Sequence, residues 1–466
     1  PKCIQLEDRV SSYLGVNATV SCNSWSSGAQ IVLRLLGIGE GDEVIIPNYT
    51  YAATLLAVYH VGAIPVIVDV DENYQISIPN ILTAITPNTK AIMPVDIGGL
   101  PTDIDSLKRL LKSNSRQFNS SNKYHNLIGR VAIISDAAHS FGATIDNTKV
   151  GNQADFTIFS LHAVKNLTSA EGGLITFNIP QIDSDSLVKE LKLIRLNGQT
   201  KDALAKTQNL ANWEYDIVLK GFKMNMPDIC AAIALGQLES YDMINSERKR
   251  VYERYASNFK DSRHLTIIPS QIENRVSSHH LMMISLSQEF KPFRNQIITH
   301  CANKGVSTNV HFKPLTLMTA FQNEQFSGSL SNSIDLFERE ISLPIYPQLS
   351  NEQVDYISKT VIDAIDEVIM GNTGTPAKYP NVSRVVALEA DLHKKTSAYS
   401  VHRNCASGMQ ALGNAYDSIA LGRSELIFAG GVESMSQMPL LYGKEMTDFF
   451  INMMKAKSMQ DKVKIL

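Results

Sequence analysis

Two residues, Asp136 and Lys165, have the types and the placement to do chemistry together. Asp136 lies near the end of the apolar run RVAIISDA (130–137), and Lys165 follows the run DFTIFS (155–160). Open parallel sheets bind ligands at the carboxyl ends of their strands. A lysine amine there can form a Schiff base with the aldehyde of pyridoxal phosphate, while a carboxylate keeps the pyridine nitrogen protonated. Taken alone, a capping Asp136 and a solvated Lys165 remain the commoner interpretation.

The elements that must position this pair follow from the apolar pattern of the first 180 residues. Short β-branched runs alternate there with helix-like stretches, and the strand candidates are 43–47, 64–70, 90–95, 130–137, 155–160 and 173–178. Continuous apolar strands separated by helical spacing predict an α/β fold with a mostly parallel sheet covered on both faces. Apolar residues recur at helical spacing within 26–36, which predicts a helix that Gly37 caps.

The rest of the chain predicts an exposed loop, a helical stretch and a smaller α/β unit. The polar stretch 113–126 is typical of an exposed loop, and 200–260 is typical of helices. A smaller α/β unit follows, with strands near 280–286 and 307–312 and a last helix over 351–366. Composition then shifts, because eight of the 15 methionines fall after residue 369. We therefore expect three domains, and they are residues 1–240, 241–365 and 366–466.

Composition and charge exclude several classes of protein. The 43 Lys and Arg against 46 Asp and Glu give a net charge of −3, so no basic field favours nucleic acid or an anionic membrane. No apolar run approaches the length of a membrane-spanning helix. The five cysteines are scattered without CxxC or zinc spacing, which favours free thiols in the cytoplasm and no metal site.

Several segments together are similar to one known family of enzymes. They are 37–54 (GIGEGDEVIIPNYTYAAT), 61–74 (VGAIPVIVDVDENY), 135–143 (SDAAHSFGA), 159–173 (FSLHAVKNLTSAEGG), 221–239 (GFKMNMPDICAAIALGQLE) and 342–357 (SLPIYPQLSNEQVDYI). This text resembles the DegT/DnrJ/EryC1/StrS family of sugar aminotransferases over about residues 1–365. The resemblance implies the aspartate-aminotransferase (type I) fold of pyridoxal-phosphate-dependent transferases.

The resemblance also implies roles for four residues at the cofactor. Lys165 matches the Schiff-base lysine, which would also move a proton between the α-carbon and C4′. Asp136 matches the partner of the pyridinium nitrogen. His139 matches the residue that hydrogen-bonds the phenolic oxygen, where the family often has Gln, and Ser160 matches a phosphate ligand.

The turn NSWSSG (23–28) occupies the family's first phosphate-binding turn. Trp25 and Ser26 stand where a Gly-Thr pair is common. Backbone N–H groups at the start of the helix favour a dianion, and the Ser26 hydroxyl can donate a hydrogen bond. We expect the bulk of Trp25 to lie where the backbone should approach the phosphate closely.

Five further residues match functional positions of the family, each beside a plainer alternative. Tyr51 matches the aromatic that stacks on the pyridine ring, or it is a core aromatic. Asn225 matches a residue lent to the neighbouring subunit's phosphate, which implies a homodimer with a shared active site, or it is a turn or helix-cap residue. His311 and Lys313 resemble a substrate-side loop, and His162 is a cofactor neighbour or a packed histidine.

Lysine at position 165 distinguishes amino transfer from dehydration, because relatives that dehydrate deoxysugars carry histidine there. The resemblance therefore implies an aminotransferase that acts on a nucleotide-linked keto sugar in deoxyamino sugar biosynthesis, with glutamate as amino donor. The segment HAVKNLTSAEGG most resembles members that aminate C4 of the sugar, and C3 stays open.

Residues from about 366 onward resemble the amino-terminal part of a thiolase. Cys405 in RNCASGMQA matches the nucleophilic cysteine, ahead of a helix whose amino end would favour the thiolate. The alternative is a buried small hydrophobe. Thiolase chemistry also needs histidines and a second cysteine that come later in that family, so we expect this segment to be inactive and poorly folded.

The ends of the two pieces suggest a composite origin. The first methionine is Met93, and Pro1–Asp8 is similar to text from inside the aminotransferase family. The join near 363–370 has no Pro/Gly/Ser-rich linker. We therefore expect a chimera of two gene fragments that lacks the initial helix and strand of the family. The rival hypothesis is a catalytically silent, truncated protein with weak cofactor binding and impaired dimerisation.

Overall fold

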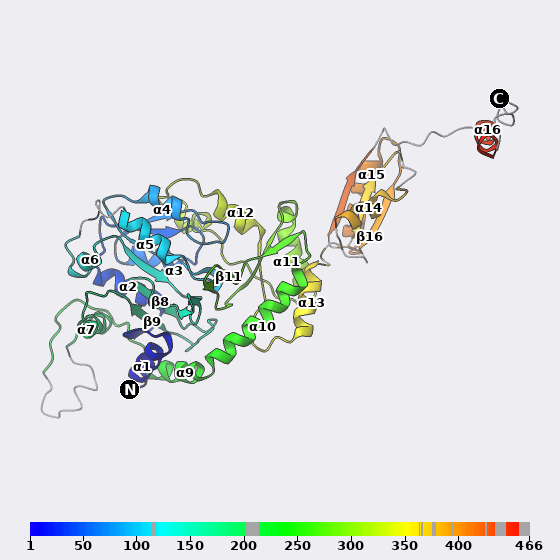
Figure 1. Cartoon of the computed structure of the whole chain (residues 1–466). Coiled ribbons are helices and arrows are strands. Elements are labelled where there is room, and N and C mark those ends of the chain that lie inside the picture. Colours follow the sequence, from blue (N-terminus) through cyan, green and yellow to red (C-terminus); the bar gives the residue numbers. More distant parts are fainter. Residues whose placement is uncertain are drawn as a thin grey trace. The chain divides into compact units, whose positions relative to one another are not determined.

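A computed structural model divides the chain into two compact units, Pro1–Ser358 and Lys359–Leu466 (Figure 1). The structure describes residues 1–113, 118, 120–200, 214–362, 364, 367–374, 379–390, 392, 396–424, 426–433 and 444–455. Four predicted segments lie partly outside these residues, namely the loop 113–126, the helical stretch 200–260, the last helix 351–366 and the thiolase-like tail from 366 onward. The predicted join near 363–370 also lies partly outside them. The further division of the first unit at residue 240 stays a prediction.

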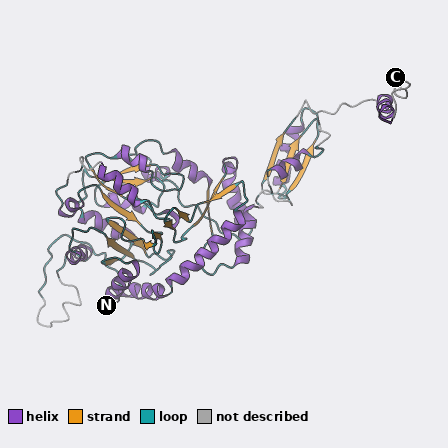
Figure 2. Ribbon diagram, viewed as in Figure 1, coloured by secondary structure: helices purple, strands orange, loops and turns teal. Residues whose placement is uncertain are grey.

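The first unit is built on a seven-stranded sheet with the order β1-β9-β8-β5-β4-β2-β3. Strands are orange and the helices around them purple in Figure 2. The five strands β8, β5, β4, β2 and β3 run parallel to one another, whereas β9 is antiparallel to both β1 and β8. The bounds are β1 Thr19–Cys22, β2 Glu43–Pro47, β3 Ile64–Val68, β4 Thr89–Ile92, β5 Ala132–Asp136, β8 Phe156–Ser160 and β9 Gly173–Phe177. The predicted α/β fold with a mostly parallel sheet is confirmed, and β1 is the one strand of this sheet that the sequence did not predict.

Both faces of the sheet are covered by helices because successive strand residues point to opposite sides. On β2, Val44 and Ile46 belong to one hydrophobic core and Ile45 to another. Helices of the first core are α2 (Trp25–Leu35), α3 (Ala53–His60) and α7 (Ser184–Arg195). On the opposite face lie α4 (Ile78–Ala84), α5 (Ile104–Ser113), α1 (Lys2–Leu14) and α9 (Asp228–Glu239).

Helix α2 confirms the prediction over 26–36. It begins at Trp25, and the Ser24 hydroxyl caps it by accepting a 3.1 Å hydrogen bond from the Ser27 N–H. Gly37 has φ +69°, the left-handed conformation that commonly ends a helix. Because α2 begins just after β1 ends, its amino end lies close to the carboxyl end of that strand.

A smaller antiparallel sheet with the order β10-β13-β14 follows in the first unit. The predicted strand at 280–286 is confirmed as β13 (Met282–Leu286). The predicted strand at 307–312 is wrong, because this segment forms just an isolated bridge between Asn309 and Ser342. β14 (Glu340–Leu343) pairs with β13 on one side, and β10 (Leu265–Ile267) pairs with it on the other.

Helices α10 (Tyr241–Phe259), α11 (Arg294–Asn303), α12 (Ser331–Arg339) and α13 (Asn351–Ile362) accompany this sheet. Arg254 of α10 donates two hydrogen bonds, of 2.6 and 2.7 Å, to Asp355 of α13. The helical prediction for 200–260 holds from residue 228 onward and is wrong for 214–227, which form bridges and loops. The loop prediction for 113–126 is wrong at its end, where α6 (Lys123–Ile128) begins.

Short elements complete the first unit. A four-stranded sheet with the order β11-β12-β6-β7 is made of strands from two distant parts of the chain, 144–149 and 271–276. Short 3-10 helices lie in several loops. The bounds of these strands and helices are β6 Thr144–Ile145, β7 Thr148–Lys149, β11 Gln271–Ile272, β12 Arg275–Val276, η1 Ile97–Gly99, η3 Gln288–Phe293, η4 Leu315–Leu317 and η5 Thr319–Phe321.

The second unit contains a three-stranded parallel sheet in which β15 lies between β16 and β17. Its elements are β15 Glu367–Gly371, β16 Ser397–Val401, β17 Ile427–Gly431, α14 Val382–Glu389, α15 Ser407–Ala420 and α16 Lys444–Lys455. Among the residues of this unit that the structure describes, Ile369, Ala411 and Ala415 form a hydrophobic core cluster. Among the helices that the structure describes, none is long and apolar enough to cross a membrane.

Candidate active site

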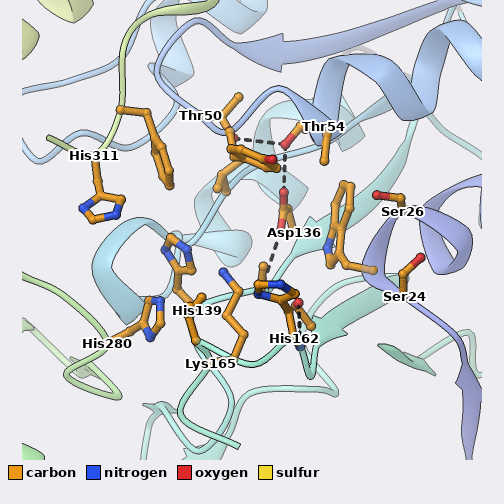
Figure 3. A pocket seen from close by; sticks show the side chains of 18 of the residues that line it. Ser24, Ser26, Thr50, Thr54, Asp136, His139, His162, Lys165, His280 and His311 are labelled. Atoms are coloured by element: carbon orange, nitrogen blue, oxygen red, sulfur yellow. Dashed lines mark hydrogen bonds between the residues drawn. The ribbon is translucent and has the colours of Figure 1, made fainter. Parts of the chain in front are cut away.

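A cavity of about 370 Å³ opens at the carboxyl edge of the seven-stranded sheet (Figure 3). Asp136 is the last residue of β5 and Ser160 the last of β8, while Ser24 follows β1 and Thr50 follows β2. Because these strands run parallel, their ends meet at one edge and bring side chains from distant parts of the sequence together. The loop after β8 adds Lys165 to the same cavity.

The Asp136 carboxylate lies at the bottom of this cavity and is almost fully buried. Its Oδ2 accepts a 2.9 Å hydrogen bond from Thr54, and its Oδ1 accepts one of 3.2 Å from the Ala138 N–H. Burial raises the pKa of Asp136 to about 7, against these two hydrogen bonds. A cation placed beside this carboxylate would therefore be strongly favoured.

The Lys165 amine is half-buried in the same cavity. Its backbone N–H donates to the His162 carbonyl at 2.9 Å, which fixes the turn that carries it. Burial lowers the pKa of Lys165 to about 8, although the Asp136 carboxylate opposes this shift. A substantial fraction of the amine is therefore neutral near pH 8, the form that can attack an aldehyde.

His139 forms the wall next to Lys165, as Figure 3 shows. Its ring lies 4.3 Å from the ring of His280 and 5.9 Å from that of Phe312. Burial lowers the pKa of His139 well below its usual value, with the Lys165 charge adding to the effect. His139 is therefore neutral, and its buried Nδ1 has no hydrogen-bond partner among the described residues.

The amino end of α2 faces the opposite side of the cavity, where Ser24 and Ser26 are labelled in Figure 3. A Cβ on Gly173 would lie 2.4 Å from the Ser24 carbonyl oxygen, so only glycine lets β9 approach this turn so closely. The Trp25 ring is 6% exposed and packs into the core around α2 while it also lines the cavity. The bulk of Trp25 therefore packs into the protein core and leaves the Ser26 turn open to the cavity.

The other predicted residues lie in different places. Tyr51 is 64% exposed and lines the cavity, so the core-aromatic alternative is wrong. His162 also lines it and is exposed beside Glu171, which contradicts the packed-histidine alternative. His311 lines the cavity, whereas Lys313 is exposed outside it. Asn225 accepts a 2.6 Å hydrogen bond from Lys223, does not cap α9 and does not line the cavity of its own chain.

Thr54 and His280 are among the residues of this site that sequence reasoning missed. Thr54 lies in the segment NYTYAAT and bonds Asp136, which the spacing after β2 could have indicated. His280 enters the cavity from the smaller sheet, and its Nδ1 lies 2.8 Å from Oδ1 of Asn166. No local signal marks His280, because its neighbour lies 114 residues earlier in the chain.

These residues fit pyridoxal phosphate. A buried carboxylate with a raised pKa suits a pyridinium nitrogen, and an amine with a lowered pKa suits an aldehyde. Within the described part of the chain, Nδ1 of His139 and Nε1 of Trp25 find no hydrogen-bond partner at the cavity walls. The amino end of α2 and the Ser26 hydroxyl offer donors to a phosphate.

Sequence comparisons agree with this geometry. A model of the DegT/DnrJ/EryC1/StrS aminotransferase family matches residues 1–362, and a model of the thiolase amino-terminal domain matches residues 349–464. The chain is 32% identical over 377 residues to "Uncharacterized protein MJ1066" of Methanocaldococcus jannaschii, covering 80% of this chain and 91% of that protein. It is 30% identical over 377 residues to the spore coat polysaccharide biosynthesis protein SpsC of Bacillus subtilis, covering 80% and 90%.

Solved structures extend the likeness to cofactor-bound proteins. The structure superposes on "Putative sugar aminotransferase Spr1654" from Streptococcus pneumoniae in its PMP form, with a TM-score of 0.74, 41% identity, and 78% and 91% of the two chains covered. The PLP form of that protein gives a TM-score of 0.73 and 38% identity over 78% and 90%. Helicobacter pylori PseC, an aminotransferase involved in the biosynthesis of pseudoaminic acid, gives 0.68 and 26% over 78% and 91%.

The lysine, the buried carboxylate and the open helix terminus thus lie together in a segment that shares its sequence pattern and fold with these enzymes. Over residues 1–362 the chain belongs to the DegT/DnrJ/EryC1/StrS aminotransferase family, whose members use pyridoxal phosphate as cofactor.

Proposed function

We propose that the first unit transfers an amino group from glutamate to a nucleotide-linked keto sugar, with Lys165 as the residue that binds the cofactor covalently. The observation that carries this proposal is the meeting of Lys165 and Asp136 in one cavity at the strand ends. SpsC and PseC, which are named for polysaccharide and pseudoaminic acid biosynthesis, support a sugar as the amino acceptor. The nucleotide, the glutamate donor and amination at C4 rest on the family resemblance.

Each side chain of the site has a role in this proposal. Bound pyridoxal phosphate supplies an electron-accepting ring next to the carbon that loses its proton. Asp136 would hold the ring nitrogen, His139 would hydrogen-bond the phenolic oxygen and Tyr51 would cover the ring. The Lys165 amine would remove the α-proton of the amino donor and return it to a neighbouring carbon. Its lowered pKa suits this exchange, because the amine accepts and releases a proton near neutral pH.

The phosphate is bound at the opposite side of the cavity. Ser26 and the backbone N–H groups that open α2 provide one set of donors, and the Ser160 hydroxyl provides another. A dianion at this helix end is stabilised by the helix dipole by about 0.3–1 kcal/mol or more where the site is partly buried. The Trp25 ring lines this side of the cavity and leaves the Ser26 turn open to it.

A homodimer completes this proposal. Asn225 lies outside the cavity of its own chain, as expected of a residue that serves the phosphate of a second copy. Apolar side chains are exposed near the site and along the helices that follow Asn225, namely Val164, Ile229, Ile233 and Met243. A second copy would cover these side chains. Light scattering of the purified chain should therefore give the mass of a dimer, and a monomer contradicts this part of the proposal.

The visible absorption spectrum of the full chain mixed with pyridoxal phosphate tests the proposal. We expect an absorption band of bound cofactor that Lys165→Ala removes and that the control Lys260→Ala, an exposed surface lysine, retains. Addition of glutamate should then convert the band to that of the amine form of the cofactor. A folded chain that gives no band with the cofactor refutes the proposal and favours the catalytically silent alternative.

A further inference from the structure

His311 lies at the edge of the cavity, on the side away from Ser24 and Ser26 (Figure 3). Buried groups hold its other polar atoms. The Tyr49 hydroxyl donates to the His311 carbonyl at 2.7 Å, and the His311 N–H donates to Oε2 of Glu340 at 2.9 Å. Ring atom Nδ1 lies 2.9 Å from the Ser342 hydroxyl. The ring is therefore fixed, and Nε2 is the polar atom left to meet a ligand.

Glu340 and Ser342 form a continuous path to this ring. They are the first and third residues of β14, so the alternation of strand side chains puts both on one face. Oε1 of Glu340 lies 2.5 Å from the Ser342 hydroxyl oxygen. Both side chains are buried, and neither lines the cavity. None of the roles proposed above uses this buried acid.

The hydrogens along this path can be arranged in two ways, because a serine hydroxyl has one hydrogen to donate. When Glu340 is ionised, Ser342 donates to it and accepts from Nδ1–H of His311, so that Nε2 is bare. When Glu340 is protonated, it donates to Ser342, Ser342 donates to Nδ1, and Nε2 carries the hydrogen. Each protonation state of the acid thus selects one tautomer of the ring.

We propose that Glu340 and Ser342 are positioning residues that set which ring nitrogen of His311 carries the proton, and thereby whether Nε2 donates to or accepts from an oxygen of the bound sugar. The proposal rests on the proposed function of the cavity. In the donating form, Nε2 gives its proton to the substrate oxygen while Nδ1 takes one from Ser342 and Ser342 takes one from Glu340. The net result is one proton moved from the acid to the substrate.

The surroundings keep the two groups in separate pH ranges. Burial raises the pKa of Glu340 to about 8, with Arg294 as the opposing charge, and the hydroxyls of Tyr49 and Tyr74 also face it. Burial and the Lys165 charge lower the pKa of His311 to about 4. The ring is therefore neutral throughout the range in which Glu340 titrates, and the titration changes its tautomer rather than its charge.

Other neighbours of the ring leave Nε2 accessible to a ligand. His139 and His280, which interact electrostatically with His311, are neutral because burial lowers their pKa values well below the usual one. The amide of Asn309 approaches Nε2 at 3.4 Å, the long limit of a hydrogen bond, and is exposed. A substrate oxygen can therefore replace this weak contact.

Nitrogen-15 NMR of the cofactor-loaded full chain, with labelled histidine, tests the proposal without a substrate. The His311 signals are assigned by their loss in His311→Gln. We expect the protonated-nitrogen signal to move from Nε2 at pH 6 to Nδ1 at pH 9 in the wild type. In Glu340→Gln the amide always donates to Ser342, so the Nε2–H form should persist at both pH values. Ser342→Ala should remove the pH dependence, whereas Glu338→Gln, an exposed acid paired with Lys291, should behave as wild type.

A tautomer that does not respond to pH, or a pH response that survives in Glu340→Gln or Ser342→Ala, overturns the proposal. Cofactor loading and its conversion by glutamate are read from the absorption spectrum of the same samples. Normal loading and conversion with an unresponsive His311 would refute the relay alone. Failure to load the cofactor would refute the proposed function, while the ring signals would still report whether Glu340 controls the tautomer.

Discussion

The two units of the chain carry their reactive side chains in opposite surroundings. Lys165 lies in a cavity whose walls come from several strands, and burial lowers the pKa of its amine to about 8. Cys405 is an exposed thiol just before α15, in the loop that follows β16 of the three-stranded sheet. The alternative that Cys405 is a buried small hydrophobe is therefore wrong. Lys165 thus lies among side chains that bury its amine, whereas Cys405 lies outside any such surroundings among the described residues.

The two units also differ in how completely their apolar side chains are buried. In the first unit, clusters of buried side chains cover both faces of the central sheet. In the second unit, α15 exposes Met409, Leu412, Tyr416 and Ile419 along one stripe, and Met409 and Tyr416 are 73% and 74% exposed. Helical spacing places these four side chains on the same face. Among the described residues, nothing covers this apolar face of the second unit, whereas the first unit buries such faces.

The largest contrast that we expect is between Asp136→Asn and Cys405→Ser. Loss of the Asp136 charge should lower kcat/KM for amino transfer by about 10²–10⁴-fold, because the ring nitrogen then lacks the carboxylate that keeps it protonated. Cys405→Ser should leave amino transfer unchanged, and the wild-type chain should not become labelled at Cys405 by acyl-CoA. Steady-state kinetics with Asp105→Asn, an exposed acid on α5, as control would check this. Equal losses in both variants would break the comparison.

Core truncations should separate the units next. Phe159→Ala, at a fully buried site of the first unit, should lower the free energy of unfolding by about 3–5 kcal/mol. Met409→Ala in the second unit should change it by no more than about 0.5 kcal/mol, because this side chain lies in solvent. Denaturant unfolding followed by circular dichroism measures both. A large loss from Met409→Ala would show that its exposed face is covered in solution.

The pH dependence of cofactor capture tests whether the cavity of the first unit lowers the pKa of Lys165. Only the neutral amine attacks the aldehyde, so the rate at which the cofactor-free chain captures pyridoxal phosphate should rise about tenfold per pH unit below pH 8 and level off above it. Stopped-flow absorbance measures this rate. A rate that rises with the slope of an ordinary lysine up to pH 10 would mean that the cavity does not lower the pKa of Lys165.

The smallest effect is expected at the helix that faces the phosphate. Ser24→Ala removes the hydroxyl that accepts from the Ser27 N–H, which should cost about 1 kcal/mol of stability. Ser12→Ala, an exposed serine on α1, is a matched control. Thermal unfolding of the two variants should separate them by a few degrees. Equal midpoints would show that the Ser24 cap does not stabilise the first unit.

The sequence predicted the parts of the fold that depend on local pattern. Strands such as β5 and β8 are continuous apolar runs, and Asp136 and Lys165 follow from their position at the ends of these runs. The segment 307–312 has the alternating pattern of a strand, but it forms just an isolated bridge between Asn309 and Ser342 of β14. Local pattern cannot decide whether such a segment pairs fully with its neighbour, because tertiary packing makes that choice.

The same limit applies to the site. His280 and Glu340 reach it from the smaller sheet, through contacts with Asn166 and His311. A buried acid beside a serine has no local signature, since its surroundings exist only in the folded chain. For Tyr51 the sequence allowed two interpretations, because a position at a strand end suits a core aromatic as well as a cavity residue. The exposure of Tyr51 in the structure shows that it lines the cavity.

Reduction of the cofactor-loaded chain with borohydride, followed by peptide mass spectrometry, tests the central claim most directly. We expect a pyridoxyl group on one lysine, Lys165, at close to one per chain. Label scattered over surface lysines such as Lys260, or absent from Lys165, would contradict it.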